Sequence, residues 1–86
     1  MKYYKRKFEE TRGDEFDDWG FAIYFFEVDF DDLPLRHIEI YENGKKLKYS
    51  KENDSDEFGF LADQPLDFSE FKNFEISENE FLENWN

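Results

Sequence analysis

The sequence predicts an α+β fold, an antiparallel sheet of about four strands with a C-terminal helix packed on one face. Three observations predict it. Apolar stretches of strand length recur through the first half of the chain, an Asn43-Gly44 pair separates two of them, and a helix-capping pattern opens at Ser77. Asn-Gly readily adopts the positive φ angles of a tight hairpin turn, and Ser-x-x-Glu is typical of a helix start.

The composition indicates one folded domain. A chain of 86 residues has room for a single hydrophobic core, so we expect residues 1–86 to form one domain. Only 38% of the residues are hydrophobic, but 22% of the chain is aromatic. Each aromatic side chain can bury about 150–250 Å², and acidic disordered chains typically lack aromatics. We therefore expect a packed core despite the net charge of −12.

The first expected element is a strand near the N-terminus, over residues 2–10, followed by a polar loop over residues 11–18. Tyr4 and Phe8 form its apolar side, and Arg6 is the exception on that side. Its solvent side is expected to carry Tyr3, Lys5, Lys7 and Glu9. Residues 19–30 are nearly all aromatic or aliphatic, which predicts a central strand covered on both faces. Pro34 ends that strand because it cannot donate to a ladder.

Residues 35–49 predict a hairpin. A two-residue Asn43-Gly44 turn places Ile40 opposite Leu47 and Ile38 opposite Tyr49, so one face would carry these four apolar side chains. The other face would carry the pairs Glu39–Lys48 and Tyr41–Lys46. His37 falls on this second face, where we expect a partly exposed imidazole without a catalytic role.

The C-terminal third is expected to be mostly irregular until its last helix. Residues 50–57 predict a polar loop, and residues 58–66 predict a packed irregular segment. Asp67 can cap a short helical turn that reaches Phe71. Ser77 caps a helix over residues 78–85, on which Phe81, Leu82 and Trp85 form one apolar stripe.

The sequence contains little that supports catalysis. It has no cysteine and one histidine, and no serine or threonine lies in a nucleophile motif. The acidic stretches 14–18 and 54–57 lack the ligand spacing of a calcium loop. We therefore expect no enzyme activity, no cofactor and no metal. No apolar run approaches the ~20 residues of a membrane span, and no signal-peptide core follows the basic start. The expected compartment is the cytoplasm.

Charge is distributed unevenly along the chain. Residues 1–12 carry five bases and two acids, whereas residues 52–86 carry eleven acids and one base. A field of this sign repels nucleic acid and anionic membranes and attracts cationic surfaces. The expected partner is a basic protein, such as a toxin or a nucleic-acid-binding protein, with no direct nucleic-acid or membrane binding. Homodimers that join basic and acidic surfaces are a further possibility, and so is acidity that only keeps the protein in solution.

Two classes of small acidic binder match this composition. The first is an immunity or antitoxin protein that neutralises a basic partner through carboxylates and aromatic anchors. The second is a nucleic-acid mimic of the anti-restriction or anti-CRISPR type, which needs acids in regular rows on an elongated surface. The uneven acidic loops favour the first. The candidate partner-binding residues are Asp14, Glu15, Asp17, Asp18, Trp19, Tyr41, Asp54, Asp56 and Glu57.

Four short motifs of the sequence also resemble those of a protein family. They are KYYKRK at residues 2–7, DEFDDWG at 14–20, YENGK at 41–45 and DQPLD at 63–67. Together they resemble a family of small, acidic, uncharacterised bacterial proteins. The resemblance implies a bacterial or phage origin and a single-domain unit, and the size and charge of the family suggest an immunity-like role. It assigns no functional residues.

Overall fold

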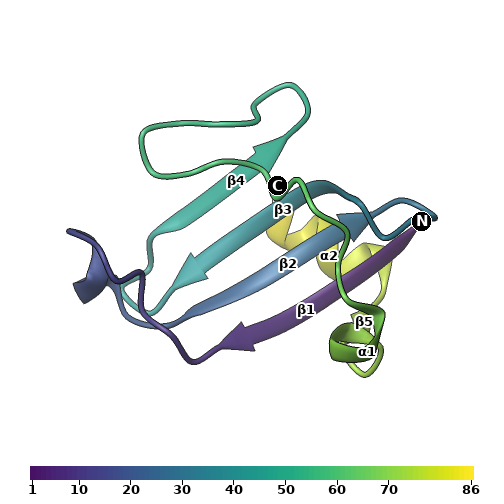
Figure 1. Cartoon of the computed structure of the whole chain (residues 1–86), viewed down its shortest axis with the longest axis horizontal. Helices are drawn as coiled ribbons and strands as arrows, with labels where there is room; N and C mark the ends of the chain where they lie inside the picture. The colour runs from purple at the N-terminus through teal and green to yellow at the C-terminus, as the bar shows by residue number, and fades with distance from the viewer.

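Five antiparallel strands form the centre of the computed structural model, which describes residues 1–86 (Figure 1). In chain order the strands are β1 (Lys2–Phe8), β2 (Ala22–Val28), β3 (Pro34–Tyr41), β4 (Lys46–Ser50) and β5 (Glu75–Ile76). The helices are the 3-10 turn η1 (Asp17–Trp19), α1 (Phe68–Phe71) and α2 (Glu78–Trp85). The strand order in the sheet is β4-β3-β2-β1-β5. The predicted α+β class is confirmed, with a short fifth strand that the sequence did not indicate.

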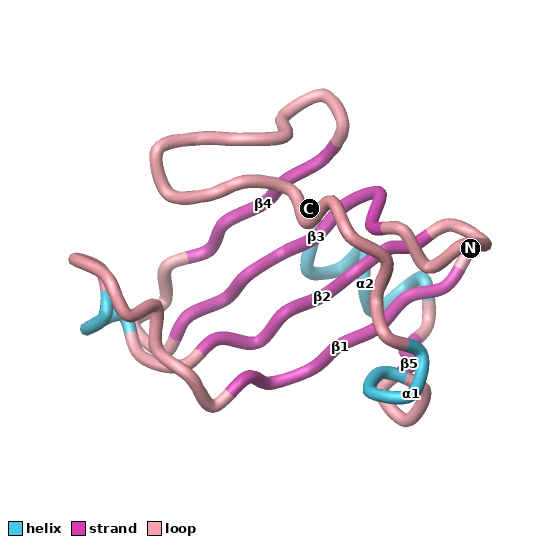
Figure 2. The backbone as a smooth tube through the Cα atoms, viewed as in Figure 1, coloured by secondary structure: helices cyan, strands magenta, loops and turns pink.

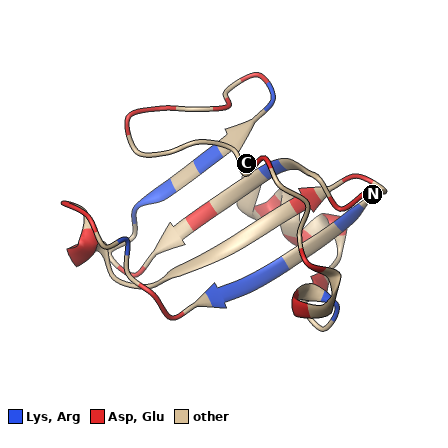
Figure 3. Ribbon diagram, viewed as in Figure 1, with Lys and Arg blue, Asp and Glu red and all other residues tan.

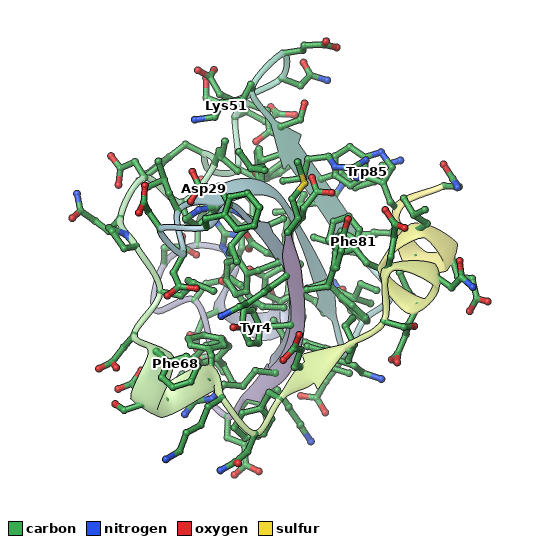
Figure 4. All side chains as sticks on the ribbon, turned by 90° about the vertical axis from the view of Figure 1, so that its right-hand side faces the viewer. Tyr4, Asp29, Lys51, Phe68, Phe81 and Trp85 are labelled. Carbon is green, nitrogen blue, oxygen red and sulfur yellow. The ribbon has the colours of Figure 1, made fainter.

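The two faces of the sheet are covered by different parts of the chain. Helix α2 packs on one face, where Phe81 joins Tyr3, Phe25 and Ile38 in a core cluster (Figure 4). The opposite face is covered by irregular chain that runs from β4 to α1 (Figure 2). Five of the seven residues of β2 are therefore buried, and the strand lies in the middle of the sheet as predicted.

Strand β1 differs from its prediction on the side expected to face solvent. Tyr3 is buried under α2, its ring centroid 5.4 Å from that of Phe81. Arg6 does lie on the apolar side with Phe8, and its guanidinium stacks over that ring at 5.1 Å. Stacking lets a planar cation lie on an aromatic surface while its edge stays wet, which explains how an arginine is accommodated there.

The hairpin forms where predicted, but its register is shifted by one residue. Tyr41 N–H donates to the Lys45 carbonyl at 2.9 Å, and Gly44 has φ +91°, so the loop has three residues and a bulge. The pairs are Ile38–Lys48, Glu39–Leu47 and His37–Tyr49. A slip of one residue turns a strand's side chains to the opposite face. The expected apolar face of Ile38, Ile40, Leu47 and Tyr49 is therefore wrong, because the last two side chains lie beside His37 and Glu39.

Both predicted helix starts are confirmed. The Asp67 carboxylate accepts from Ser69 N–H at 2.9 Å and caps α1, and the Ser77 hydroxyl accepts from Glu80 N–H at 3.1 Å and caps α2. Such bonds satisfy amide groups that have no partner inside the helix. Between the two helices, β5 pairs with β1 beside Tyr3 and Tyr4, which fixes where α2 begins.

Candidate functional site

The two acidic loops that the sequence predicted as a binding surface meet in the structure. Residues 54–61 fold back on themselves through hydrogen bonds from Asp56 N–H to the Gly59 carbonyl and from Leu61 N–H to the Asp54 carbonyl. Phe58 lies at the end of this fold. Its ring centroid is 5.3 Å from that of Phe16 and 5.3 Å from that of Trp19. The aromatic cluster thereby joins loop 14–18 to loop 52–57, and we call the two loops together the acidic surface.

Arg12 ties the two loops to the sheet. Its guanidinium donates to Asp14 at 3.4 Å, to the Tyr41 hydroxyl at 3.1 Å and to the backbone carbonyl of Phe58. The same group lies 5.2 Å from the centre of the Trp19 ring. The planar guanidinium of one partly buried arginine can hold several acceptors in fixed directions. Arg12 therefore positions both halves of the acidic surface.

Some carboxylates of the acidic surface are used inside the loops. Asp14 accepts from Phe16 N–H and Asp17 from Gly13 N–H, each at 2.8 Å. Asp56 accepts from Phe58 N–H and from the Tyr49 hydroxyl, both at 2.8 Å. Burial raises the pKa of Asp56, but these hydrogen bonds outweigh it and leave the pKa below its ordinary value. These three acids hold the loop shapes through their hydrogen bonds.

The remaining acids of the surface are free to meet a partner. They are exposed, and no lysine or arginine lies within ion-pair distance of them. The four such residues among the predicted ones are Glu15, Asp18, Asp54 and Glu57. They are the part of the candidate site that contributes uncompensated negative charge.

The predicted aromatic anchors have internal roles. Trp19 is half-buried, with its ring centroid 5.2 Å from that of Tyr41. Tyr41 itself is 4% exposed, so the expectation that it lies on an open face of the hairpin is wrong. The cause is the covering loop 51–61, which packs over this face of the sheet. Both residues support the acidic surface from below.

His37 is also buried, contrary to the partly exposed position expected for it. It is 2% exposed, and its Nε2 lies 2.9 Å from Oε2 of Glu39. Ala62 N–H donates to Nδ1 at 3.2 Å, so the ring carries its proton on Nε2 and donates it to the carboxylate. Tyr41 donates to the other oxygen of Glu39 at 2.6 Å. The shift in hairpin register and the covering segment together enclose this network.

The network is fully satisfied and has no geometry for metal binding. Burial raises the pKa of Glu39, but hydrogen bonds from His37 and Tyr41 more than offset this, and the pKa lies below its ordinary value. Every buried side-chain nitrogen and oxygen has a partner. No group of three or more His, Asp and Glu side chains is placed to hold a metal ion. The network forms a hydrogen-bonded floor beneath the two loops, and the Glu39 carboxylate also lies 4.0 Å from the Arg12 guanidinium.

The structure also exposes an aromatic residue that the sequence assigned to the central strand. Phe30 is 91% exposed at the tip of the turn between β2 and β3. The Asp29 carboxylate accepts from Asp31 N–H at 2.8 Å and from Leu33 N–H at 3.0 Å, and Asp32 has φ +62°. The acids on both sides of Phe30 were the signal that could have revealed a turn there.

Bases and acids occupy different parts of the molecule. Lysines lie on the two outer long strands, Lys5 and Lys7 on β1 and Lys46 and Lys48 on β4 (Figure 3). Acids lie mainly in the loops beyond the strand ends and on α2 (Figure 3). Strand β4 is an edge of the sheet, and lysines on an edge strand discourage pairing with another sheet.

Comparison with protein-family models, curated proteins and solved structures gave no match to this chain. The resemblance to small acidic bacterial proteins therefore stays a prediction. No helix of the structure has the length and apolar character needed to cross a bilayer.

Proposed function

We propose that this protein is a small acidic binding protein that neutralises a basic macromolecular partner, in the manner of an immunity protein or antitoxin. The observation that supports this function best is the junction of loops 14–18 and 52–57 into one surface through Phe16, Trp19 and Phe58. Five exposed carboxylates of this surface take part in no ion pair and no hydrogen bond within the loops, those of Glu15, Asp18, Glu52, Asp54 and Glu57. Clustered charge of one sign accelerates encounter with an oppositely charged surface and suppresses binding of like-charged ones.

The construction of the surface also supports a binding role. Arg12 and the aromatic cluster hold the loops in place before any partner arrives, and a preorganised surface loses less conformational entropy on binding. The partner class is a basic protein, a toxin or a nucleic-acid-binding protein, and the compartment we propose is the cytoplasm. Nucleic acid and membranes are not proposed as direct partners, because the net charge of −12 repels phosphate.

The alternative is a nucleic-acid mimic that blocks a DNA-binding protein. A mimic presents carboxylates in rows along an elongated body. The molecule measures 35 × 28 × 24 Å, and lysines occupy both outer long strands of its sheet. These features favour a single acidic patch over a mimic of the phosphate backbone. Self-association between the lysine-bearing strands and the acidic surface of another copy is tested by the oligomeric state.

The proposal is tested by affinity capture from the source organism at low and at high salt. A variant with Glu15→Gln, Asp18→Asn and Glu57→Gln removes three charges from the acidic surface. A control variant with Asp63→Asn, Glu75→Gln and Glu83→Gln removes three exposed, unpaired charges elsewhere. We expect a basic protein to be retained at low salt by the native chain and by the control, and to be lost from the first variant and at high salt. Equal retention by both variants, or no basic protein at low salt, overturns the proposal.

A further inference from the structure

Two rows of cross-strand partners cross the face of the sheet that carries α2. Each row has a lysine at either end and two apolar residues between them. The first row is Lys5, Phe25, Ile38 and Lys48, and the second, two residues further along the strands, is Lys7, Ile23, Ile40 and Lys46. Because neighbouring strands lie about 4.8 Å apart, the Cα atoms of the two lysines of a row stand about 14 Å apart. Each row is therefore an apolar strip framed by two cations.

Helix α2 covers the first row and contacts both of its lysines. It lies behind the half of the sheet that is nearest the N-terminus (Figure 1). The Lys5 ammonium lies 3.4 Å from the Glu80 carboxylate, and Lys48 donates to the carbonyl of Trp85, the last residue of α2, over 2.9 Å. These contacts show that the helix runs across the strands from β1 to β4. The first row therefore accommodates an amphipathic helix that brings a carboxylate to one lysine and its C-terminal carbonyls to the other.

The second row has the same pattern of residues but stays partly open to solvent. Ile23 and Ile40 are paired with each other and only half-buried, whereas Phe25 and Ile38 of the first row are 3% and 0% exposed. A helix with its side chains is about 10–12 Å wide, but the seven residues of β2 extend over about 23 Å. One helix that crosses the strands therefore leaves the second row without a cover.

The lysines of the second row form no ion pair within the chain. Lys7 and Lys46 are exposed, and neither lies within ion-pair distance of a carboxylate. The Lys7 ammonium lies over the ring of Phe21, 5.9 Å from its centre, which places a further aromatic side chain beside the row. An apolar strip between two unpaired cations is complementary to a surface that has apolar residues along its middle and carboxylates at its ends.

We propose that the second row is a docking site for an acidic amphipathic helix of a partner protein. The helix lies beside α2 and forms the same kind of contacts. Its apolar side chains pack on Ile23 and Ile40, and a carboxylate of its first turn meets Lys7. Lys46 binds the carbonyls at its C-terminal end, which attract cations. About nine residues of helix span the distance between the lysines. The proposal does not rest on the proposed function, because this partner surface is acidic and docks on the other face of the sheet from the covering loop 51–61.

A second copy of this chain does not supply such a helix. The apolar residues of α2 already pack on its own sheet, and its outward residues Glu78, Asn79 and Glu83 are polar and exposed. Helix α1 has only 4 residues and is too short to reach across a row. The docking site therefore matches a different protein better than it matches another copy.

The proposal is tested on the full chain by NMR titration with a peptide of about 18 residues, which is long enough to form a helix in isolation. The peptide has leucines along one face and glutamates elsewhere. The same peptide with lysines in place of the glutamates is the control probe, and it is the one that the net charge of −12 attracts. We expect the glutamate peptide to shift the amide signals of Lys7, Ile23 and Ile40 in spite of the net repulsion, and the lysine peptide to leave these three signals in place.

Two pairs of lysine substitutions separate the docking site from the total charge. Lys7→Gln with Lys46→Gln should weaken binding of the glutamate peptide by about fivefold, the effect of losing two surface ion pairs. Lys51→Gln with Lys72→Gln makes the same change in net charge at exposed, unpaired lysines outside the row, and should bind the peptide as the native chain does. A folded Ile40→Thr variant should also bind more weakly, because the strip loses apolar surface.

Four outcomes overturn the docking site. The glutamate peptide shifts none of the three signals, or the lysine peptide shifts them equally. The Lys7, Lys46 variant binds the glutamate peptide as tightly as the native chain does, or the Lys51, Lys72 variant loses as much affinity, so that only the total charge matters. If the same signals move when the native chain is concentrated without peptide, a second copy occupies the row and the partner helix is excluded.

Discussion

His37 donates a hydrogen bond from Nε2 to Oε2 of Glu39 over 2.9 Å, and both side chains lie inside the molecule beneath the acidic surface. The second oxygen of Glu39 accepts from Tyr41, and Nδ1 of His37 accepts from Ala62 N–H. Each of these polar groups forms a hydrogen bond with another group that has no access to water. A buried polar network of this kind is stable only while all of its members are present.

Replacing His37 with leucine should therefore destabilise the fold. The change leaves one oxygen of Glu39 and the amide of Ala62 without partners, and we expect the free energy of unfolding to fall by about 2–4 kcal/mol. Urea unfolding followed by tryptophan fluorescence measures the loss. The double variant His37→Leu, Glu39→Leu should recover part of it, because the unpaired charge is removed. A single variant as stable as the native chain would show that the network contributes nothing.

The stability should also depend on pH through Glu27 and Glu39. Arg36 donates to both oxygens of Glu27, at 2.7 and 2.8 Å, and holds its pKa below the ordinary 4.5. The pKa of Glu39 lies below 4.5 as well, because hydrogen bonds from His37 and Tyr41 outweigh the effect of burial. Folding therefore favours the ionised forms. The two ionised carboxylates contribute fully to the free energy of unfolding above their pKa in the unfolded chain. This contribution is lost as the pH falls through their lower pKa values in the folded protein.

Measurement of this effect needs a comparison between variants. Protonation of the many surface acids at low pH relieves charge repulsion and raises the stability, which opposes the loss expected from Glu27 and Glu39. We expect the stability difference between the native chain and the Glu27→Gln, Glu39→Gln variant to shrink as the pH falls from about 5 to about 3. Urea midpoints at each pH give this difference. A difference that is constant over the range contradicts the shifted pKa values.

The hairpin shows what local sequence could and could not predict. Asn43-Gly44 located the turn correctly, but the number of residues in the loop depends on Glu42. Its carboxylate accepts from Phe21 N–H at 2.7 Å, and its own N–H donates to the Phe21 carbonyl at 3.0 Å. These contacts join the turn to a segment some twenty residues away, which local turn preferences do not contain. The helix caps were predicted because donor and acceptor are neighbours in the sequence.

The candidate site also has features that the local sequence predicts and features that it does not. The acids of loops 14–18 and 52–57 were evident from composition, as was their exposure. Their junction depends on Phe16 meeting Phe58 across the fold, and the sequence contains no signal for that contact. Trp19 and Tyr41 were expected to contact a partner directly. An aromatic residue in a polar stretch can equally serve as the support of a loop, and the alternation pattern alone does not separate the two.

Two glycines test the geometry of the hairpin and its neighbour. Gly44 has φ +91° with open space around it, whereas Gly20 has φ +87° and an added Cβ would lie 2.9 Å from Cβ of Glu42. Alanine at Gly44 should cost about 1–2 kcal/mol for the left-handed backbone alone. Alanine at Gly20 should cost more, because it also displaces the Glu42 side chain from Phe21. Thermal or urea unfolding of the two variants ranks the costs, and an equal or reversed order would contradict the contact.

Arg12→Lys tests whether one side chain holds the acidic surface together. Lysine keeps the charge but cannot donate in three fixed directions to Asp14, Tyr41 and Phe58. We expect faster amide hydrogen exchange at residues 13–18 and 56–60, with the exchange of β2 and β3 unchanged, because the loops open locally while the sheet stays folded. Arg6→Lys is the matched control, since Arg6 stacks on Phe8 and Phe71 away from these loops. If the two loops exchange as slowly in Arg12→Lys as in the native chain, the aromatic cluster alone joins them. If only one loop exchanges faster, Arg12 anchors that loop to the sheet and does not connect the two.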